Sequence, residues 1–375
     1  MNFMANSETA TQNGSARGGY LFQILLVILI LIVLAACTTS AAQQPTSTPQ
    51  PLAQEIVYYD WDDSIMGPIL ADFTKEYGIK ATLAFYSSSE EAVANIKAGQ
   101  VYDVVLLENQ FVPSLSREGL LAEIDRSHIL NFKHISPNFR DLAYDPGNKH
   151  TVPDSWGTTG LVVRSDLVDE PITRWADLWD PRYTHKVVGW AIPRYMLSVA
   201  LKSLGYSVNS EDPEQLEEAL GRLLELKPNM ILLDDEPSSA PLLIEGEAVM
   251  AVGWAGDVQL GQQENEAIQY VLPEEGAILW GDNFVIPANS PHQYEAELLL
   301  NFILRPEISG RIINASYFPL VNDAATPFID PEILNDPIIY PPNEDLKNAE
   351  IMLPLSPEGE KLYADIWDRF MAVGN

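Results

Sequence analysis

Residues 55–108 read EIVYYDWDDSIMGPILADFTKEYGIKATLAFYSSSEEAVANIKAGQVYDVVLLE, and this stretch decides the fold. Short runs of β-branched and aromatic residues predict strands, and the amphipathic segments between them predict helices. The first helix begins near Pro68 and ends at Tyr77, because Gly78 follows it directly. The predicted strands are 55–60, 79–86 and 102–107. Strands and helices that alternate at this spacing predict an α/β fold with a largely parallel sheet.

The second half of the chain continues this pattern. Further strands are predicted at 186–189, 230–233 and 248–254. Further helices are predicted at 110–118, 196–204, 213–226, 292–304, 307–314 and 357–373. Ligands of open parallel sheets bind beyond the carboxyl ends of the strands. The candidate site residues therefore follow the expected strands, and they are Asp60 and Trp61, Glu108 and Gln110, Trp254, and Trp280 with Asp282.

Cys37 is the only cysteine, and it ends the most hydrophobic run of the chain. Leu34-Ala-Ala-Cys37 looks like a bacterial lipobox, in which the cysteine is acylated and becomes the first mature residue. An uncleaved membrane anchor and an ordinary secretory signal are the alternatives, and all three place the rest of the chain outside the cytoplasm. Residues 38–54 are rich in Ser, Thr, Pro and Gln, which predicts a flexible linker. A single cysteine can form no internal disulfide.

The charge of the chain limits its partners. Lys and Arg number 22 against 53 Asp and Glu, which gives a formal net charge of −31. The lack of a basic patch argues against nucleic acid as a partner. An acidic surface attracts cations, although acidic residues also serve simply to keep an exported protein soluble. Roughly 320 residues lie beyond the linker, which is enough for two core-bearing lobes.

The sequence contains no motif of catalysis or cofactor binding. It has no phosphate-binding GxxxxGK[ST], no GxGxxG after a strand, no HExxH and no GxSxG. The five histidines are scattered and have no metal-ligand spacing. We therefore expect a protein that is not an enzyme and has neither a cofactor nor a metal ion.

Three tryptophans, Trp61, Trp254 and Trp280, each follow a predicted strand, and Asp60 and Asp282 lie beside two of them. An indole face attracts a cation by about 0.5–2 kcal/mol, and a desolvated carboxylate adds charge-assisted hydrogen bonds. A pocket of this composition suits an ammonium group. The alternative is that each tryptophan packs in the core, which is the commoner role for a single tryptophan. Trp175, Trp179 and Trp367 lie in helix-like surroundings and are interpreted as packing residues.

Short segments spread over residues 55–372 carry a family resemblance. They are Tyr59-Asp60-Trp61, 73–80 (FTKEYGIK), 102–105 (YDVV), Trp156-Gly157, 175–181 (WADLWDP), 204–207 (LGYS), 245–247 (EGE), Trp254, 273–276 (PEEG), 280–282 (WGD), 286–289 (IPAN), 301–306 (NFILRP) and Tyr340-Pro341. In this order they resemble the spermidine/putrescine-binding proteins of polyamine ABC importers. The resemblance implies an α/β, two-lobed periplasmic-binding-protein (type II) architecture with two crossover strands and a ligand cleft between the lobes.

The resemblance also implies ligand contacts at Trp61, Trp254, Trp280 and Asp282, which match three family aromatics and the acid that grips an amine. Several other family positions differ here. They are Ser64 for a tyrosine, Glu108 and Gln110 for a serine and a tyrosine, Ile192 and Tyr195 for a pair of acids, Phe318 for a tyrosine and Met352 for a glutamine. The missing pair of acids weakens the charge match for an extended polycation. Glu108 could restore one charge from the other wall of the cleft.

The function implied is that of an extracytoplasmic solute-binding lipoprotein of an ABC importer, which captures a putrescine- or spermidine-like amine and delivers it to the permease. The alternatives are a receptor for a different small cationic or amino-organic solute, an exported enzyme and a sensor. The expected ligand-binding residues are Trp61, Trp254, Trp280, Asp282, Glu108, Gln110, Tyr195, Asp60, Ser64 and Phe318. The expected partners are the amine, the permease subunits and, through lipidated Cys37, the cell membrane on its periplasmic or outer face. We expect a monomer.

Five segments are predicted along the chain. They are a lipoprotein signal peptide at 1–36, the lipidated cysteine with its linker at 37–54, a first lobe at 55–160 plus 284–345, a second lobe at 161–283, and a C-terminal helical segment at 346–375 that packs on the lobes.

Overall fold

The computed structural model describes residues 52–374 except 62–64 and 235–237, so the predictions for Cys37, Ser64 and most of the linker lie outside the described residues. The described strands form one sheet in the order β2-β1-β3-β9-β4-β7-β5-β6, with β8 beside β4 and β10 beside β9. The strands are β1 Glu55–Trp61, β2 Lys80–Tyr86, β3 Val104–Glu108, β4 Thr151–Arg164, β5 Val187–Trp190, β6 Met230–Leu233, β7 Met250–Trp254, β8 Ile268–Val271, β9 Ile278–Val285 and β10 Glu350–Ile351. The helices are α2 Met66–Tyr77, α3 Ser89–Lys97, α4 Val112–Arg117, α5 Pro193–Ser203, α6 Pro213–Leu226, α7 Ala240–Ile244, α8 Ala255–Glu264, α9 Gln293–Ile303, α10 Pro306–Ser316, α11 Pro331–Leu334 and α12 Pro357–Ala372.

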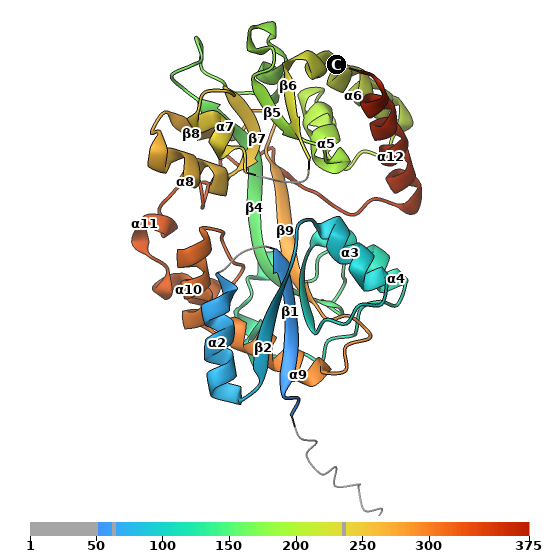
Figure 1. The fold of residues 1–375 in the computed structure, drawn as a ribbon, viewed down its shortest axis with the longest axis vertical. Coiled ribbons are helices and arrows are strands. Elements are labelled where there is room, and N and C mark those ends of the chain that lie inside the picture. Colours follow the sequence, from blue (N-terminus) through green and yellow to red (C-terminus); the bar gives the residue numbers. More distant parts are fainter. Residues whose placement is uncertain (1–51, 62–64, 235–237, 375) are drawn as a thin grey trace, which may run out of the picture. The chain divides into compact units, whose positions relative to one another are not determined.

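Two neighbouring strands, β4 and β9, run through the middle of the molecule and join two lobes (Figure 1). The end of β9 pairs with β3 in the first lobe, and the end of β4 pairs with β7 in the second. The first lobe contains β1–β3 with α2, α3, α4, α9 and α10, and the second contains β5–β7 with α5, α6, α8 and α12. The predicted fold class, an α/β two-lobed architecture with two crossover strands, is confirmed.

The expectation of a largely parallel sheet is wrong at the centre of the sheet. Within the lobes, β1 pairs in parallel with β2 and β3, and β5 pairs in parallel with β6 and β7. The crossover strands run antiparallel to β3, to β7 and to each other. Neither crossover strand is evident from the sequence, because β4 contains Pro153, Gly157 and Gly160 and β9 contains Gly281-Asp-Asn283, and these residue types are depleted in strands.

The strands and helices that carry site residues mostly begin and end where local sequence signals indicate. Trp61, Glu108 and Trp254 are the last residues of β1, β3 and β7, as their order in the sequence indicates. Trp280 lies inside β9 and not after a strand, so that prediction is wrong. Helix α5 begins three residues before the predicted 196, because Pro193 fits the first helical position. Tyr195 is therefore in the first turn of α5.

Each lobe has its own hydrophobic core. The first is built around α2, α9 and α10 against the β1–β3 side of the sheet, and the second around α5, α6 and α12. The packing role predicted for three tryptophans is confirmed. Trp175 and Trp367 are buried in the second core, and Trp179 packs against it while its indole N–H donates to the Arg222 carbonyl at 2.7 Å.

The C-terminal segment packs on the second lobe and forms hydrogen bonds with it. Helix α12 packs on α5 and α6. The buried guanidinium of Arg194 donates to the Leu353 carbonyl at 2.9 Å, and Lys202 donates to the Asn348 carbonyl at 3.0 Å. Lys202 also pairs with Glu350 at 2.9 Å. These contacts hold the segment beside α5, the helix that carries Tyr195.

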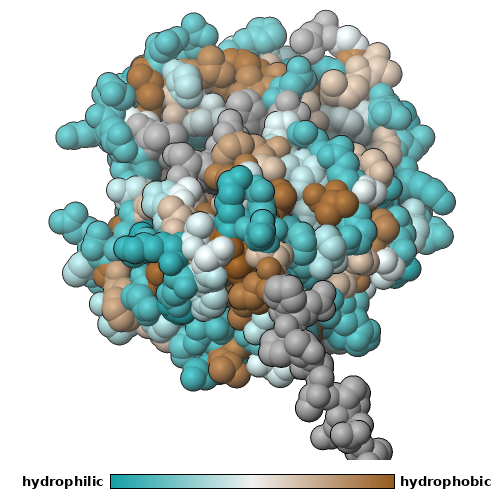
Figure 2. Space-filling view, turned by 60° about the horizontal axis from the view of Figure 1, so that its bottom comes forward, coloured by the Kyte–Doolittle hydropathy of each residue, from teal (hydrophilic) through white to brown (hydrophobic). Residues whose placement is uncertain are grey.

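Figure 2 shows one face on which hydrophilic residues predominate and hydrophobic residues form separate patches. Scattered apolar residues of this kind are normal on globular proteins. In residues 52–374, outside the two gaps, no helix is both long and apolar enough to span a bilayer.

Candidate functional site

A cavity of about 290 Å³ lies between the two lobes, close to the crossover strands. This volume suits a small organic molecule. The described residues that line it are Tyr58, Asp60, Trp61, Ile65, Met66, Ser87, Leu106, Glu108, Asp154, Ser155, Tyr195, Trp254, Trp280, Asp282, Phe284, Ile312, Ser316, Phe318 and Leu320. Four of these described lining residues are carboxylates and none of them is Lys, Arg or His. The charged side chains among these described lining residues are therefore all acidic, and most of the other side chains are aromatic or aliphatic.

One carboxylate, Asp60, stands at the end of β1. It is buried, and its two oxygens accept from the Tyr58 hydroxyl and from the Trp61 backbone N–H, each at 2.7 Å. Tyr58 and Asp60 are two residues apart, so a strand places them on the same face. Burial, with the charges of Asp60 and Asp154, raises the pKa of Tyr58 well above its usual value, so this hydroxyl stays a donor.

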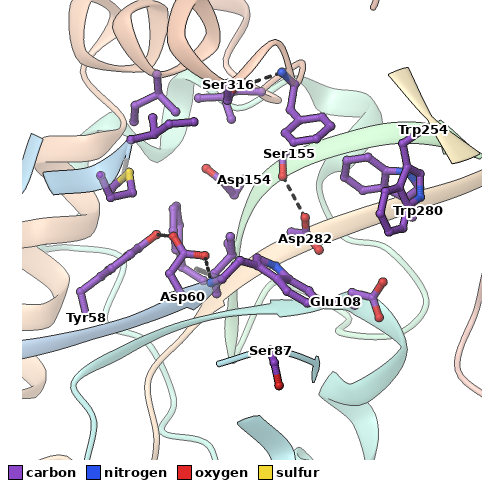
Figure 3. A pocket seen from close by; sticks show the side chains of 18 of the residues that line it. Tyr58, Asp60, Ser87, Glu108, Asp154, Ser155, Trp254, Trp280, Asp282 and Ser316 are labelled. Atoms are coloured by element: carbon purple, nitrogen blue, oxygen red, sulfur yellow. Dashed lines mark hydrogen bonds between the residues drawn. The ribbon is translucent and has the colours of Figure 1, made fainter. Parts of the chain in front are cut away.

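Glu108 and Asp282 face each other across the ladder between β3 and β9. Glu108 accepts from the Gln110 amide at 2.7 Å and from the Tyr195 hydroxyl at 3.0 Å. Asp282 accepts from the Ser155 hydroxyl at 3.2 Å. In Figure 3 Asp282 points into the pocket near Asp154, and Glu108 lies on the side of Trp254 and Trp280.

The pKa values of both of these carboxyl groups are raised. Burial raises the pKa of Glu108 to about 7, although the hydrogen bonds from Gln110 and Tyr195 act in the opposite direction. Burial, followed by the negative charges of Glu108 and Asp154, raises the pKa of Asp282 well above its usual value. A positive charge placed between them would relieve the repulsion that causes part of the shift.

Aromatic rings form a large part of the remaining lining of the pocket. Trp254 stacks on Trp190 with ring centroids 4.3 Å apart, and its indole N–H donates to the Thr159 hydroxyl at 3.0 Å. Trp280 meets Phe318 edge to face at 5.6 Å. Trp61 packs against Tyr86 at 4.8 Å. Because these neighbours fix the rings, their faces can contact a ligand without further ordering.

Gly157 makes room for one of these rings. It lies directly opposite Trp280 in the pairing of β4 with β9. A Cβ atom at position 157 would lie 2.6 Å from Cε2 of the indole, which is closer than real contacts. The two crossover strands therefore hold Trp280 close against the backbone of β4.

The structure brings most of the predicted site residues together around this pocket. Eight of them line it, namely Asp60, Trp61, Glu108, Tyr195, Trp254, Trp280, Asp282 and Phe318. Gln110 is not in the lining and reaches the site through its hydrogen bond to Glu108. Ile192 precedes α5, and Met352 is buried in the core of the second lobe.

Sequence reasoning missed several lining residues. Tyr58 could have been found from the two-residue period of β1, which places it beside Asp60. Asp154 and Ser155 lie in β4, which was not recognised as a strand, and the register of β4 against β9 shifts between Pro153 and Trp156. The other unpredicted lining residues carry no local signal of a site, because only packing brings them to the cavity; they are Ile65, Met66, Ser87, Leu106, Phe284, Ile312, Ser316 and Leu320.

The described residues contain no group of three His, Cys, Asp or Glu side chains arranged to hold a metal ion. Three carboxylates of the pocket, Asp60, Glu108 and Asp282, instead accept from hydroxyl, amide and backbone N–H donors. Such a site can bind and orient an organic cation between carboxylates and indole faces.

The chain matches the family model of bacterial extracellular solute-binding proteins over residues 69–341. It is 34% identical over 298 residues to the spermidine/putrescine-binding periplasmic protein of Escherichia coli K12, covering 79% of this chain and 85% of that protein. It is 28% identical over 331 residues to the putrescine/agmatine-binding protein of Pseudomonas aeruginosa, covering 83% and 90%. A solved structure of the spermidine/putrescine ABC transporter substrate-binding protein PotD from Streptococcus pneumoniae matches with a TM-score of 0.75 at 32% identity, covering 85% of this chain and 99% of that chain.

Two lobes, two crossover strands and a pocket between the lobes define a periplasmic binding protein, a class that captures solutes and does not transform them. This chain belongs to the family of bacterial extracellular solute-binding proteins. The resemblance to spermidine/putrescine-binding proteins is confirmed, and so is the prediction that the chain is not an enzyme.

Proposed function

We propose that this chain is the extracytoplasmic solute-binding lipoprotein of an ABC importer, and that it captures putrescine, spermidine or a closely related amine. The observation that carries the proposal is the lining of the pocket, in which Asp60, Glu108, Asp154 and Asp282 surround one small cavity with no Lys, Arg or His among the described lining residues. Relatives named for spermidine and putrescine support the same choice.

The chemistry of the pocket matches a flexible organic polycation. Putting an ammonium group into a dry pocket is costly unless carboxylates compensate its charge. Asp282 and Glu108 can do so where β3 pairs with β9, and Asp60 and Asp154 can do so elsewhere in the lining of the same cavity. The indoles of Trp61, Trp254 and Trp280 offer apolar faces for the methylene chain and cation–π contact for the amines.

A second candidate is a different small cationic or amino-organic solute. The observation that favours it is the pair Ile192 and Tyr195, which stands where the family resemblance implies two acids. Tyr195 lines the pocket with a neutral hydroxyl. A site with fewer acids in the second lobe suits a shorter or less charged ligand than spermidine.

Putrescine or spermidine is expected to stabilise the protein against heat. A ligand at about one hundred times its Kd raises the free energy of unfolding by about 2.7 kcal/mol, because it binds only the folded state. Differential scanning fluorimetry with putrescine, spermidine, agmatine and γ-aminobutyrate checks this and ranks the ligands. An unchanged Tm with all three polyamines would remove the polyamine proposal, and a shift with γ-aminobutyrate alone would favour the second candidate.

We also propose that acylated Cys37 tethers the protein to the cell membrane, with the lobes outside the cytoplasm. The linker at 38–54 would span on the order of 20–25 Å root-mean-square, which lets the protein dock on a permease in the same membrane. Cys37→Ser is expected to move the protein from the membrane fraction to the soluble extracytoplasmic fraction, as measured by immunoblotting of cell fractions. Retention of the variant in the membrane would point to the uncleaved anchor.

We propose a monomer whose lobes, 55–160 plus 284–345 and 161–283, close around the ligand by a hinge in the crossover strands. The segment 346–375 moves with the second lobe, which its packing on α5 and α6 supports.

A further inference from the structure

We propose that Glu108 and Asp282 together hold one ammonium group of the ligand, that Tyr195 positions Glu108 for this contact, and that the two carboxylates release a shared proton when the ligand binds. This inference rests on the proposed function and names the residue pair that determines how an amine is selected. Glu108 is central because it is an acid on β3 in the first lobe. It lies across the cleft from Tyr195, which belongs to the second lobe.

The geometry of the pair lets both carboxylates contact one ligand group. Glu108 and Asp282 are directly opposite in an antiparallel ladder, and such residues have Cβ atoms about 4.5–5.5 Å apart on one face of the sheet. Both side chains line the same cavity. Their carboxylates can therefore both contact a single ammonium group, which has three N–H donors to share.

Hydrogen bonds from neighbouring side chains hold the pair in place. Glu108 accepts from the Gln110 amide and the Tyr195 hydroxyl, and Asp282 accepts from the Ser155 hydroxyl. All three donors are neutral. They orient the carboxylates without neutralising them, so the charge of the pair remains to be compensated by a proton or by a ligand.

Tyr195 has a particular place in this arrangement. It stands in the first turn of α5 in the second lobe, and its hydroxyl reaches across the cleft to Glu108 in the first lobe. The neighbouring Arg194 is fixed by the Leu353 carbonyl and by the Asn209 side chain at 2.7 Å. The turn that carries Tyr195 is thereby anchored, and the contact ties the orientation of Glu108 to the approach of the two lobes.

The electrostatic environment of Glu108 and Asp282 is set by burial and by the titratable groups around them. The titratable groups that face the pair are Glu90 on α3, Tyr86 on β2, Asp60 on β1, Tyr144 before β4, Asp154 on β4, and Arg194 and Tyr195 on α5. Arg194 is the only cation among them, and it has a smaller effect on Glu108 than burial has. The pKa of Glu108 is raised to about 7 and that of Asp282 well above its usual value, so the empty pair retains a proton near neutral pH.

Because the pKa of Glu108 is raised to about 7, the pair loses a proton as the pH rises through the neutral range. Amine ligands stay protonated across this range, so the titrating group belongs to the protein. Only the ionised pair attracts the ammonium fully, so binding tightens as pH rises through the pKa of Glu108. For a single group of this kind the affinity increases about tenfold between about pH 6 and about pH 8.

Isothermal titration calorimetry of the full mature protein with putrescine and with spermidine tests the proposal. Titrations near pH 6.5 in two buffers of different ionisation enthalpy give the number of protons exchanged, expected to be about one released per ligand. Glu108→Gln is expected to bind roughly ten- to a hundredfold more weakly near pH 8 and to lose the part of the proton release that Glu108 contributes. Circular dichroism melting confirms that the variant is folded.

Two further variants distinguish the role of the Tyr195 hydroxyl from that of the carboxylates and from that of acids outside the pocket. Tyr195→Phe keeps both carboxylates but removes a hydrogen bond that lowers the pKa of Glu108, so its affinity should still rise with pH, with the rise moved to higher pH. Glu264→Gln removes an exposed acid at the end of α8, outside the pocket, and should behave like the wild type.

The outcomes distinguish this inference from the proposed function. Tight amine binding by the wild type with no buffer dependence of the heat would overturn the inference and leave the proposed function standing. Unchanged affinity of Glu108→Gln would do the same. If the wild type binds neither amine at any pH, both the proposed function and the inference fail.

Discussion

Replacing Asp282 with asparagine is expected to weaken the binding of putrescine or spermidine by roughly two orders of magnitude. Truncating one partner of a buried charge pair costs about 2–5 kcal/mol, much of it because the other charge is left without compensation. The asparagine side chain would keep the shape and one hydrogen-bond acceptor for Ser155 but could not carry the charge that the ammonium needs. Isothermal titration calorimetry gives the change in Kd directly.

The same substitution is expected to affect the ligand-free protein in the opposite direction. The pKa of Asp282 is raised in the folded state, so its ionised form costs stability once pH exceeds the value for an unfolded chain. Asparagine removes that cost, and the free variant should melt at the same or a higher temperature near neutral pH. Asp368→Asn, which changes an exposed acid on α12, is the matched control and should change neither quantity. Retained affinity in Asp282→Asn would exclude this carboxylate as an amine ligand.

Gly157→Ala is expected to disrupt the pocket by displacing Trp280, one of the side chains that line it. The added methyl group would overlap the indole of Trp280, which is held between β4 and Phe318. Trp280 must then rotate into the cavity or β4 must move away from β9, and overpacking of this kind costs about 1–3 kcal/mol. We expect a lower Tm and at least a roughly tenfold weaker affinity for amines, because the indole would occupy space that the ligand needs.

Thermal melting and calorimetry of this variant need a control for the effect of an alanine itself. Gly221→Ala in α6 supplies it, because an added Cβ there meets nothing within 4 Å and alanine favours a helix. That control should keep its affinity and gain a little stability. If Gly157→Ala binds amines as tightly as the wild type, Trp280 does not need its present position to form the site.

The strand-end rule located part of the site because strand ends are local properties. Trp61 and Trp254 end strands whose β-branched and aromatic runs are visible in the sequence, and the acid Asp60 comes with the first of them. The rule was wrong for Trp280, because β9 continues through glycine and polar residues that a strand tolerates only when neighbours on both sides pair with it. For the same reason β4 could not be predicted as a strand from the sequence. Asp154 and Ser155, which lie in β4, were therefore not predicted as site residues.

The resemblance to a family supplied what local patterns could not. It indicated the two crossover strands and named Trp280 and Asp282 as site residues, and the pocket contains both. It also drew attention to Ile192 and Tyr195 as positions without acids. It could not show what replaces those acids, since the contact of Tyr195 with Glu108 joins residues 87 positions apart in the chain.

The sequence by itself determined the α/β class, most helices and outer strands, the acidic character and the single candidate lipidation site, because propensity, periodicity and composition act over a few residues. The tertiary structure decided the antiparallel centre of the sheet, the space that Gly157 leaves for Trp280, and the pairing of Glu108 with Asp282 under the Tyr195 hydroxyl. Those features depend on which distant segments meet. The acidity of the pair depends on the burial and the neighbouring charges that this meeting creates, and no short stretch of sequence carries that information.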